Sequence, residues 1–245
     1  MTERVNILGV KVDAVTMAQA VECVTKLISA DKSSMVATAN AEMLLNATHD
    51  AELKAILNAA SLVVPDGAGT VWAARHLGKF MPERVAGFDL VQELMKISPR
   101  NDWKIFLFGA APGIADKAKL KAEELYPGIK IVGTRNGYFK PEDEPEIVAQ
   151  IKSSRADILL AALGVPKQEK WLAAHKDELK IPVSIGVGGT FDVMAGVVKR
   201  APLWMQRARL EWLFRAMLQP SRAGRLIALP KFVWQVHKQR TADNQ

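Results

Sequence analysis

Asp66 is the carboxylate whose place in the sequence best suits catalysis. It follows the apolar residues 62–65 and precedes Gly67 and Gly69, so a strand would end beside it and a ligand could approach the backbone closely. A carboxylate there could act as a general base on a hydroxyl group, which typically contributes ~10²–10⁴ in rate. The local sequence slightly favours a simpler role, in which Asp66 caps the helix that starts near Gly69.

Three glycine loops could bind phosphate. Gly109, Gly164 and the pair Gly188-Gly189 each follow an apolar run and lead toward a helical stretch. Free backbone N–H groups and the helix dipole at such a junction favour an anion. A single loop of this kind is more often only a tight turn, but three in one chain favour a nucleotide or a nucleotide-sugar as the ligand.

The sequence lacks the common phosphate and metal motifs. It has no G-x-x-x-x-G-K-[ST], which argues against a P-loop NTPase, and no G-x-G-x-x-G in a first strand–helix unit, which argues against a dinucleotide dehydrogenase. No D-x-D pair could hold a metal on a diphosphate. We therefore expect arginines, lysines and helix N-termini to meet a diphosphate, with no metal and no cofactor. One cysteine and four scattered histidines exclude a disulfide framework and the common zinc patterns.

Short apolar runs alternate with helical stretches along most of the chain. Strands are expected over residues 5–8, 34–37, 62–64, 104–108, 130–132, 157–163 and 183–187. Helices are expected over residues 16–30, 51–60, 69–76, 89–97, 114–125, 144–153 and 168–175. Thr16 and Gln19 fit a capping box, residues 5–15 fit an antiparallel hairpin, and Asp89 and Asp192 are interpreted as helix caps. The pattern predicts an α/β fold with a mainly parallel sheet flanked by helices, whose ligand site lies outside the carboxyl ends of the strands.

Positive charge is concentrated at the end of the chain. The 245 residues carry a net charge of +7. Residues 199–245 hold ten basic and two acidic side chains, whereas residues 1–198 hold 23 basic and 24 acidic ones. This contrast divides the chain into an α/β body, residues 1–198, and a basic C-terminal appendage, residues 199–245. We expect the body to fold without the appendage.

The appendage is expected to be helical and to meet a membrane surface. One apolar stripe recurs in it at helical spacing: Leu210, Leu213, Phe214, Met217 and Leu218. A helix packed on the body would explain the stripe equally well, but the basic charge and the tryptophans Trp204, Trp212 and Trp234 favour contact with anionic lipid headgroups. The longest apolar run, residues 158–165, is far too short to span a bilayer, and no signal peptide is visible. We therefore expect a cytoplasmic protein that reaches a membrane without crossing it.

Several of these loops together carry the pattern of a known family. In chain order the pattern consists of Thr38-Ala39-Asn40-Ala41-Glu42, Pro65-Asp66-Gly67-Ala68-Gly69, Arg84-Val85-Ala86-Gly87-Phe88-Asp89-Leu90, Asn136-Gly137-Tyr138-Phe139, Gly164-Val165-Pro166-Lys167-Gln168-Glu169, Gly186-Val187-Gly188-Gly189-Thr190-Phe191-Asp192, Lys199-Arg200-Ala201-Pro202 and Leu210-Glu211-Trp212-Leu213-Phe214-Arg215. From about residue 7 to residue 225 the chain resembles the WecG/TagA/CpsF family of bacterial glycosyltransferases, glycosyltransferase family 26. It departs from the usual family pattern in two places: Ala39 and Ala41 stand where prolines are common, and Gln219-Pro220-Ser221-Arg222 stands where Glu-Pro-Arg-Arg is common.

The resemblance implies a Rossmann-like, inverting glycosyltransferase. The usual family reaction transfers N-acetylmannosamine, or its uronic acid, from a UDP-sugar to undecaprenyl-diphosphate-linked N-acetylglucosamine, in the synthesis of teichoic acid and other cell-surface polysaccharides. The resemblance therefore implies a peripheral location on the inner face of the bacterial cell membrane, and it leaves homo-oligomer formation open. Another UDP-hexose, such as glucose in exopolysaccharide synthesis, remains the alternative donor.

The resemblance also implies roles for individual residues. Asp66 matches the catalytic base of the family, and Thr38 and Asn40 match its neighbouring active-site motif. Arg84 and Gln168 match residues placed at the donor sugar and diphosphate. The appendage supplies matching arginines at three positions: Arg215, Arg222 and Arg225.

Two other classes of protein fit part of the sequence. A nucleic-acid-binding protein would use the same basic appendage on phosphates, but no known reader motif accompanies that appendage. A nucleotide-dependent dehydrogenase would share the α/β fold, but the glycine motif of that class is missing.

Overall fold

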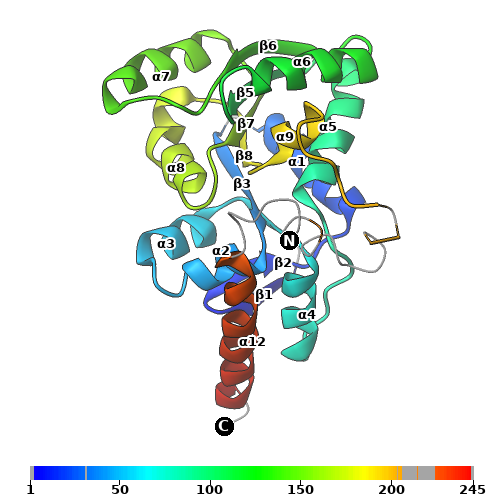
Figure 1. Cartoon of the computed structure of the whole chain (residues 1–245), viewed down its shortest axis with the longest axis vertical. Coiled ribbons are helices and arrows are strands. Elements are labelled where there is room, and N and C mark those ends of the chain that lie inside the picture. Colours follow the sequence, from blue (N-terminus) through cyan, green and yellow to red (C-terminus); the bar gives the residue numbers. More distant parts are fainter. Residues whose placement is uncertain (1–2, 31, 203, 206–213, 215–223, 244–245) are drawn as a thin grey trace.

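A parallel sheet of six strands forms the centre of the molecule (Figure 1). The computed structural model of the chain describes residues 3–30, 32–202, 204–205, 214 and 224–243. The strands lie in the order β4-β3-β8-β7-β5-β6, and all neighbouring strands run parallel. Their bounds are β3 Ser34–Ala39, β4 Leu62–Pro65, β5 Lys104–Gly109, β6 Lys130–Arg135, β7 Ile158–Ala162 and β8 Val183–Gly186. These strands confirm the predicted Rossmann-like α/β fold.

All seven helices expected in the body are present. Their bounds are α1 Met17–Ile28, α3 Ala51–Ala59, α4 Ala68–His76, α5 Gly87–Asn101, α6 Ile114–Leu125, α7 Glu144–Ser153 and α8 Lys167–Leu179. The capping box at α1 is confirmed, because the Thr16 hydroxyl accepts from the Gln19 N–H and the Gln19 side chain accepts from the Thr16 N–H. Three short elements were not expected, since so few residues do not show a period: α2 Ala41–Asn46, α9 Thr190–Met194 and the 3-10 turn η1 Pro141–Asp143.

The predicted antiparallel hairpin forms a separate two-stranded sheet. Its strands are β1 Arg4–Ile7 and β2 Val10–Asp13. Asp13 joins the hairpin to the main sheet, because one carboxylate oxygen pairs with Arg4 Nε at 2.9 Å and the other accepts from the Val63 N–H at 2.8 Å. The N-terminal residues are therefore held beside β4.

Helices cover both faces of the sheet, and each face has its own apolar core. Every residue of β3, β4, β7 and β8 is buried, as expected for parallel strands covered on both sides. One core packs the hairpin and the helices α2, α3, α4, α7 and α8 against the sheet. The other core packs α1, α5, α6 and α9 against the opposite face.

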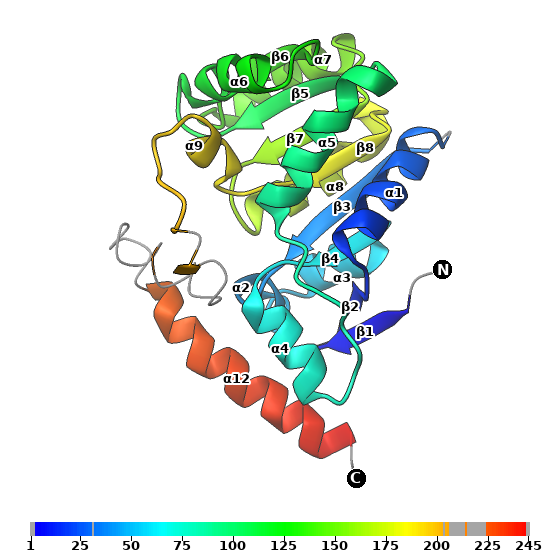
Figure 2. The same ribbon diagram turned by 90° about the vertical axis from the view of Figure 1, so that its right-hand side faces the viewer.

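The last described helix, α12 Gly224–Asp243, packs against α2 and α4 (Figure 2). It continues through Pro230, and Phe232 and Val236 on its inner side belong to the first core. Gln239 extends the contact to the hairpin, where its side chain accepts from the Leu8 N–H at 2.8 Å and donates to the Asn6 carbonyl at 3.0 Å. Because part of the appendage completes the core, we expect the body to lose stability without it, contrary to the expectation of independent folding.

The apolar stripe of residues 210–218 lies almost entirely outside the described residues, which include only Phe214 of it. Among the helices that the structure describes, none combines the length and the apolar character needed to cross a membrane.

The packing of α12 predicts unequal effects for two aromatic side chains on the same helix. Phe232 is 1% exposed and lies 6.5 Å, ring centre to ring centre, from Trp72, whereas Trp234 is 60% exposed. Phe232→Ala should lower the free energy of unfolding by about 3 kcal/mol, because it leaves a cavity in the core. Trp234→Ala should change it by less than about 1 kcal/mol. Urea unfolding of both variants measures the difference, and equal effects would show that α12 is not part of the core.

Candidate active site

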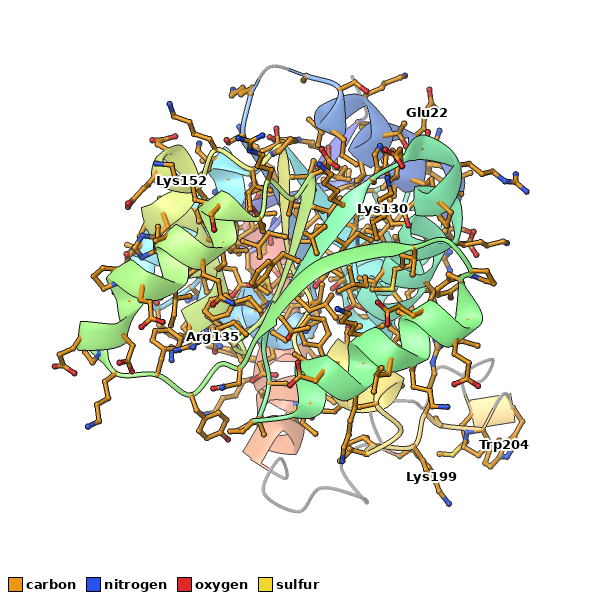
Figure 3. The ribbon with its side chains drawn as sticks, turned by 90° about the horizontal axis from the view of Figure 1, so that it is seen from above. Glu22, Lys130, Arg135, Lys152, Lys199 and Trp204 are labelled. Carbon is orange, nitrogen blue, oxygen red and sulfur yellow. The ribbon has the colours of Figure 1, made fainter. Side chains whose placement is uncertain are left out.

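The carboxyl ends of the parallel strands meet along one edge of the sheet (Figure 2). The two edges of the sheet can be told apart in Figure 3, where Arg135 marks the carboxyl end of β6 and Lys130 marks its amino end. Lys199 and Trp204, at the start of the appendage, lie on the same side as Arg135. The predicted ligand edge of the sheet therefore adjoins the basic appendage.

Asp66 lies directly after β4 and does not cap α4. The N-cap residue of α4 is Gly67, with φ +91°. The interpretation of Asp66 as the N-cap residue is therefore wrong. The backbone of Asp66 is fixed from both sides, since its N–H donates to the Ala39 carbonyl at 2.9 Å and its carbonyl accepts from the Thr70 hydroxyl at 3.2 Å. This places the partly exposed Asp66 beside the end of β3.

Asn40 is the N-cap of α2, next to the Asp66 loop. Its side-chain oxygen accepts from the Met43 N–H at 3.0 Å. A Cβ atom at Gly67 would lie 3.8 Å from the Asn40 Cβ, so the two strand ends are in close contact. The cap uses only the amide oxygen of Asn40, and the amide NH₂ group is not needed for it.

Thr38 ties β3 to β8 across the ligand edge. Its buried hydroxyl group donates to the Gly186 carbonyl at 3.0 Å. Gly87 lies against it so closely that an added Cβ would be 2.9 Å from the Thr38 Cγ2 atom. Arg84 belongs to the segment that leads to Gly87, and the N–H of the following Val85 donates to the Pro65 carbonyl at 3.0 Å. Thr38, Asn40, Asp66 and Arg84 are thus brought together at the ends of β3 and β4.

Gln168 joins the loops that follow β7 and β8. It is 1% exposed, and its side-chain oxygen accepts from the Gly164 N–H at 3.2 Å and the Gly188 N–H at 3.1 Å. Its Nε2 donates to Glu169 Oε1 at 2.7 Å. These two glycine N–H groups, expected to face a diphosphate, already have an acceptor within the protein. Gln168 therefore holds the two loops together from a buried position.

The other predicted glycines fit tight packing. At Gly109, φ is +125° and an added Cβ would lie 2.4 Å from the Ala162 carbonyl oxygen, so only glycine allows β5 and β7 to end side by side there. Gly189 is the N-cap of the short helix α9. Both residues lie at the ligand edge, as expected, but their geometry is explained by the fold alone.

Glu169 is a site residue that the sequence analysis did not single out. It is 1% exposed, and burial raises its pKa to about 7. Among the described residues, no group makes a hydrogen bond to its buried Oε2 atom. A signal was present, because Glu169 lies three and ten residues before Leu172 and Leu179, on the buried side of α8.

Asp89 and Asp192 are not helix caps, contrary to expectation. The N-caps of their helices are Ala86 and Gly189, without side-chain capping bonds. Asp89 instead makes a two-point ion pair with Arg200, with distances of 2.6 and 2.8 Å. This pair joins the first turn of α5 to the start of the appendage.

The predicted appendage arginines are only partly placed. Arg225 lies at the start of α12, and Arg215 and Arg222 fall outside the described residues. Among the residues with described positions, no group of three His, Cys, Asp or Glu side chains could hold a metal ion.

Comparison with known proteins finds the same family as the sequence pattern. The family model described as glycosyl transferase WecG/TagA/CpsF matches residues 5–245. A Staphylococcus aureus (strain NCTC 8325) protein named N-acetylglucosaminyldiphosphoundecaprenol N-acetyl-beta-D-mannosaminyltransferase is 37% identical over 241 residues, which cover 97% of this chain and 93% of that protein. The protein of the same name from strain MRSA252 is 36% identical over the same share.

The raised pKa of Glu169 predicts a pH-dependent loss of stability that Glu169→Gln removes. Unfolding lowers this pKa from about 7 to its usual 4.5, so the folded state holds the proton more tightly. Below pH 4.5 the Glu169 carboxyl group is neutral in both the folded and the unfolded state and does not destabilise the fold. As the pH rises toward 7 the carboxyl group ionises in the unfolded state first, and this lowers the free energy of unfolding of the wild type. The free energy of unfolding of Glu169→Gln, relative to wild type, should therefore rise by about 3 kcal/mol across this range.

Denaturant unfolding at a series of pH values measures this difference. Asp177→Asn, at an exposed position of the same helix, is the control and should stay parallel to wild type. Parallel curves for Glu169→Gln and wild type would contradict the raised pKa.

Proposed function

The chain belongs to the WecG/TagA/CpsF family of glycosyl transferases, and on this basis we propose that it transfers N-acetylmannosamine from a UDP-sugar to undecaprenyl-diphosphate-linked N-acetylglucosamine. The activity for which the Staphylococcus aureus relatives are named supports N-acetylmannosamine over its uronic acid or glucose. Such a reaction belongs to the synthesis of teichoic acid or a related surface polysaccharide. Family membership also sets aside the nucleic-acid-binding and dehydrogenase alternatives.

The position of Asp66 carries the proposed mechanism. It lies at the carboxyl end of β4, next to the loop that carries Asn40, and is partly exposed. In an inverting transfer, Asp66 would take the proton of the acceptor hydroxyl group while that oxygen attacks the anomeric carbon and the bond to UDP breaks. One base is sufficient, because the acceptor oxygen displaces UDP from the anomeric carbon in a single step.

The departing UDP gains negative charge, which the site must stabilise. We propose that Arg84 and the appendage arginines Arg215, Arg222 and Arg225 supply positive charge to the diphosphate, without a metal ion. Thr38 and Gln168 would act by holding the strand ends, since their polar groups bond to the backbone there. In this proposal the donor binds at the loops after β7 and β8, and Arg84 reaches its diphosphate from the ends of β3 and β4, where the base lies.

We further propose that the appendage, residues 199–245, brings the enzyme to the inner face of the bacterial cell membrane. A lipid-linked acceptor requires such contact. On α12 the basic side chains of Lys231 and Lys238 are exposed together with the apolar Val233 and Trp234. Exposed basic and apolar groups on one helix suit the surface of an anionic bilayer.

Asp66→Asn should lower the rate of sugar transfer more than about 100-fold, because amide groups cannot accept the proton. Its affinity for UDP-sugar should stay within a few-fold of wild type, since the base faces the acceptor. Release of UDP, measured with UDP-N-acetylmannosamine and a short lipid-diphosphate-N-acetylglucosamine, tests both statements. Asp102→Asn, at an exposed position before β5 at the opposite edge, is the control. A rate above one tenth of wild type would rule out Asp66 as the base.

Membrane binding should depend on the basic residues of α12. The double variant Lys231→Glu/Lys238→Glu should sediment less with phosphatidylglycerol vesicles than wild type, and wild-type binding should weaken at high salt. Lys117→Glu/Lys152→Glu changes the net charge equally at exposed positions on α6 and α7 and serves as the control. Equal loss in both double variants would show that net charge alone, and not α12, mediates binding.

A further inference from the structure

We propose that Glu169 is a positioning residue for the donor site: its buried carboxyl group fixes the orientation of the Gln168 carboxamide, which in turn holds the loops after β7 and β8. The inference rests on the proposed function, because these loops lie where that function places the UDP-sugar. Glu169 would not touch the substrate, and its effect would pass through Gln168.

The contacts of Gln168 allow only one orientation of its amide group. Two backbone N–H groups, of Gly164 and Gly188, point at the same side-chain atom, and that atom must be an oxygen because two donors need an acceptor. The NH₂ group then points the opposite way and needs an acceptor of its own. Glu169 Oε1 supplies this acceptor at 2.7 Å.

The pair of side chains packs directly against the backbone at the end of β8. An added Cβ at Gly186 would lie 2.6 Å from Gln168 Nε2 and 2.8 Å from Glu169 Oε1. Gly186 is held in turn by the Thr38 hydroxyl group at 3.0 Å. A reoriented Gln168 amide would therefore disturb the ends of β7 and β8 directly.

Stability alone does not explain a carboxyl group at position 169. A buried polar group is destabilising unless its hydrogen bonds are made, and Oε2 of Glu169 has no partner among the described residues. An apolar side chain of similar size would fit the same place without that penalty, but it would leave the Gln168 NH₂ group without its acceptor. The carboxyl group is thus explained by what it does to Gln168.

Loss of the acceptor should loosen the donor site more than it slows the chemical step. If the Gln168 amide turned over, its NH₂ group would face the N–H groups of Gly164 and Gly188, and the loops would have to shift. Asp66 follows β4, which lies two strands away from β8 in the sheet. We therefore expect the KM for UDP-N-acetylmannosamine and the Kd for UDP to rise, with a smaller change in kcat.

Two substitutions at one position separate positioning from stability. Glu169→Met keeps the approximate size of the side chain and removes the acceptor, whereas Glu169→Gln keeps an acceptor oxygen and removes the charge. Titration calorimetry with UDP should give a Kd about tenfold higher for Glu169→Met and within about threefold of wild type for Glu169→Gln. Glu178→Met, an exposed position on the same helix, should bind UDP like wild type. Denaturant unfolding at pH 8 should show Glu169→Met to be at least as stable as wild type.

The remaining outcomes of these measurements would contradict either the positioning role of Glu169 or the proposed function. Equal UDP affinity in wild type and Glu169→Met would overturn the positioning role, and so would an equal loss in Glu169→Gln and Glu169→Met, because glutamine retains the acceptor. If Glu169→Met binds weakly but is also largely unfolded, the effect is structural and the inference fails. Wild-type protein that neither binds UDP nor transfers sugar would instead overturn the proposed function.

Discussion

The hydrogen bonds of one buried carboxamide hold the ligand edge of this protein together. Gln168 accepts from the loops after β7 and β8, and the Thr38 hydroxyl group joins the end of β8 to the end of β3. Parallel strands pair along their length, but nothing in that pairing fixes the loops beyond their last residues. Side chains that bond to loop backbone supply this missing constraint, and they do so under the surface, where water does not compete.

The constraint depends on the two apolar cores. Because helices cover both faces of the sheet, the side chains of β3, β7 and β8 are buried and the strand ends are rigid supports. Burial also has a consequence for Glu169, whose pKa is raised to about 7 by loss of solvent. The same low-dielectric surroundings that strengthen its bond to Gln168 make its ionised form unfavourable.

The appendage contacts the body in two places. Phe232 and Val236 of α12 pack into the core beside α2 and α4, the helices that begin immediately after Asn40 and Gly67. Arg200 pairs with Asp89 at the start of α5. These contacts anchor α12 and Arg200 next to the elements that carry the proposed base, so the proposed membrane contact would lie close to the active site.

The sequence by itself determined the succession of strands and helices along the chain, the position of Asp66 after a strand, and the family. Strand and helix periods arise from neighbouring residues, so local patterns are enough to predict them. The tertiary structure alone decided that Asp66 and Asp89 do not cap helices, that Gln168 bonds to glycine N–H groups, and that Glu169 is buried beside it. These outcomes depend on contacts between distant residues, such as Thr38 with Gly186 and Gln239 with Leu8. Such contacts exist only once the strands have been placed side by side, and no local pattern records them.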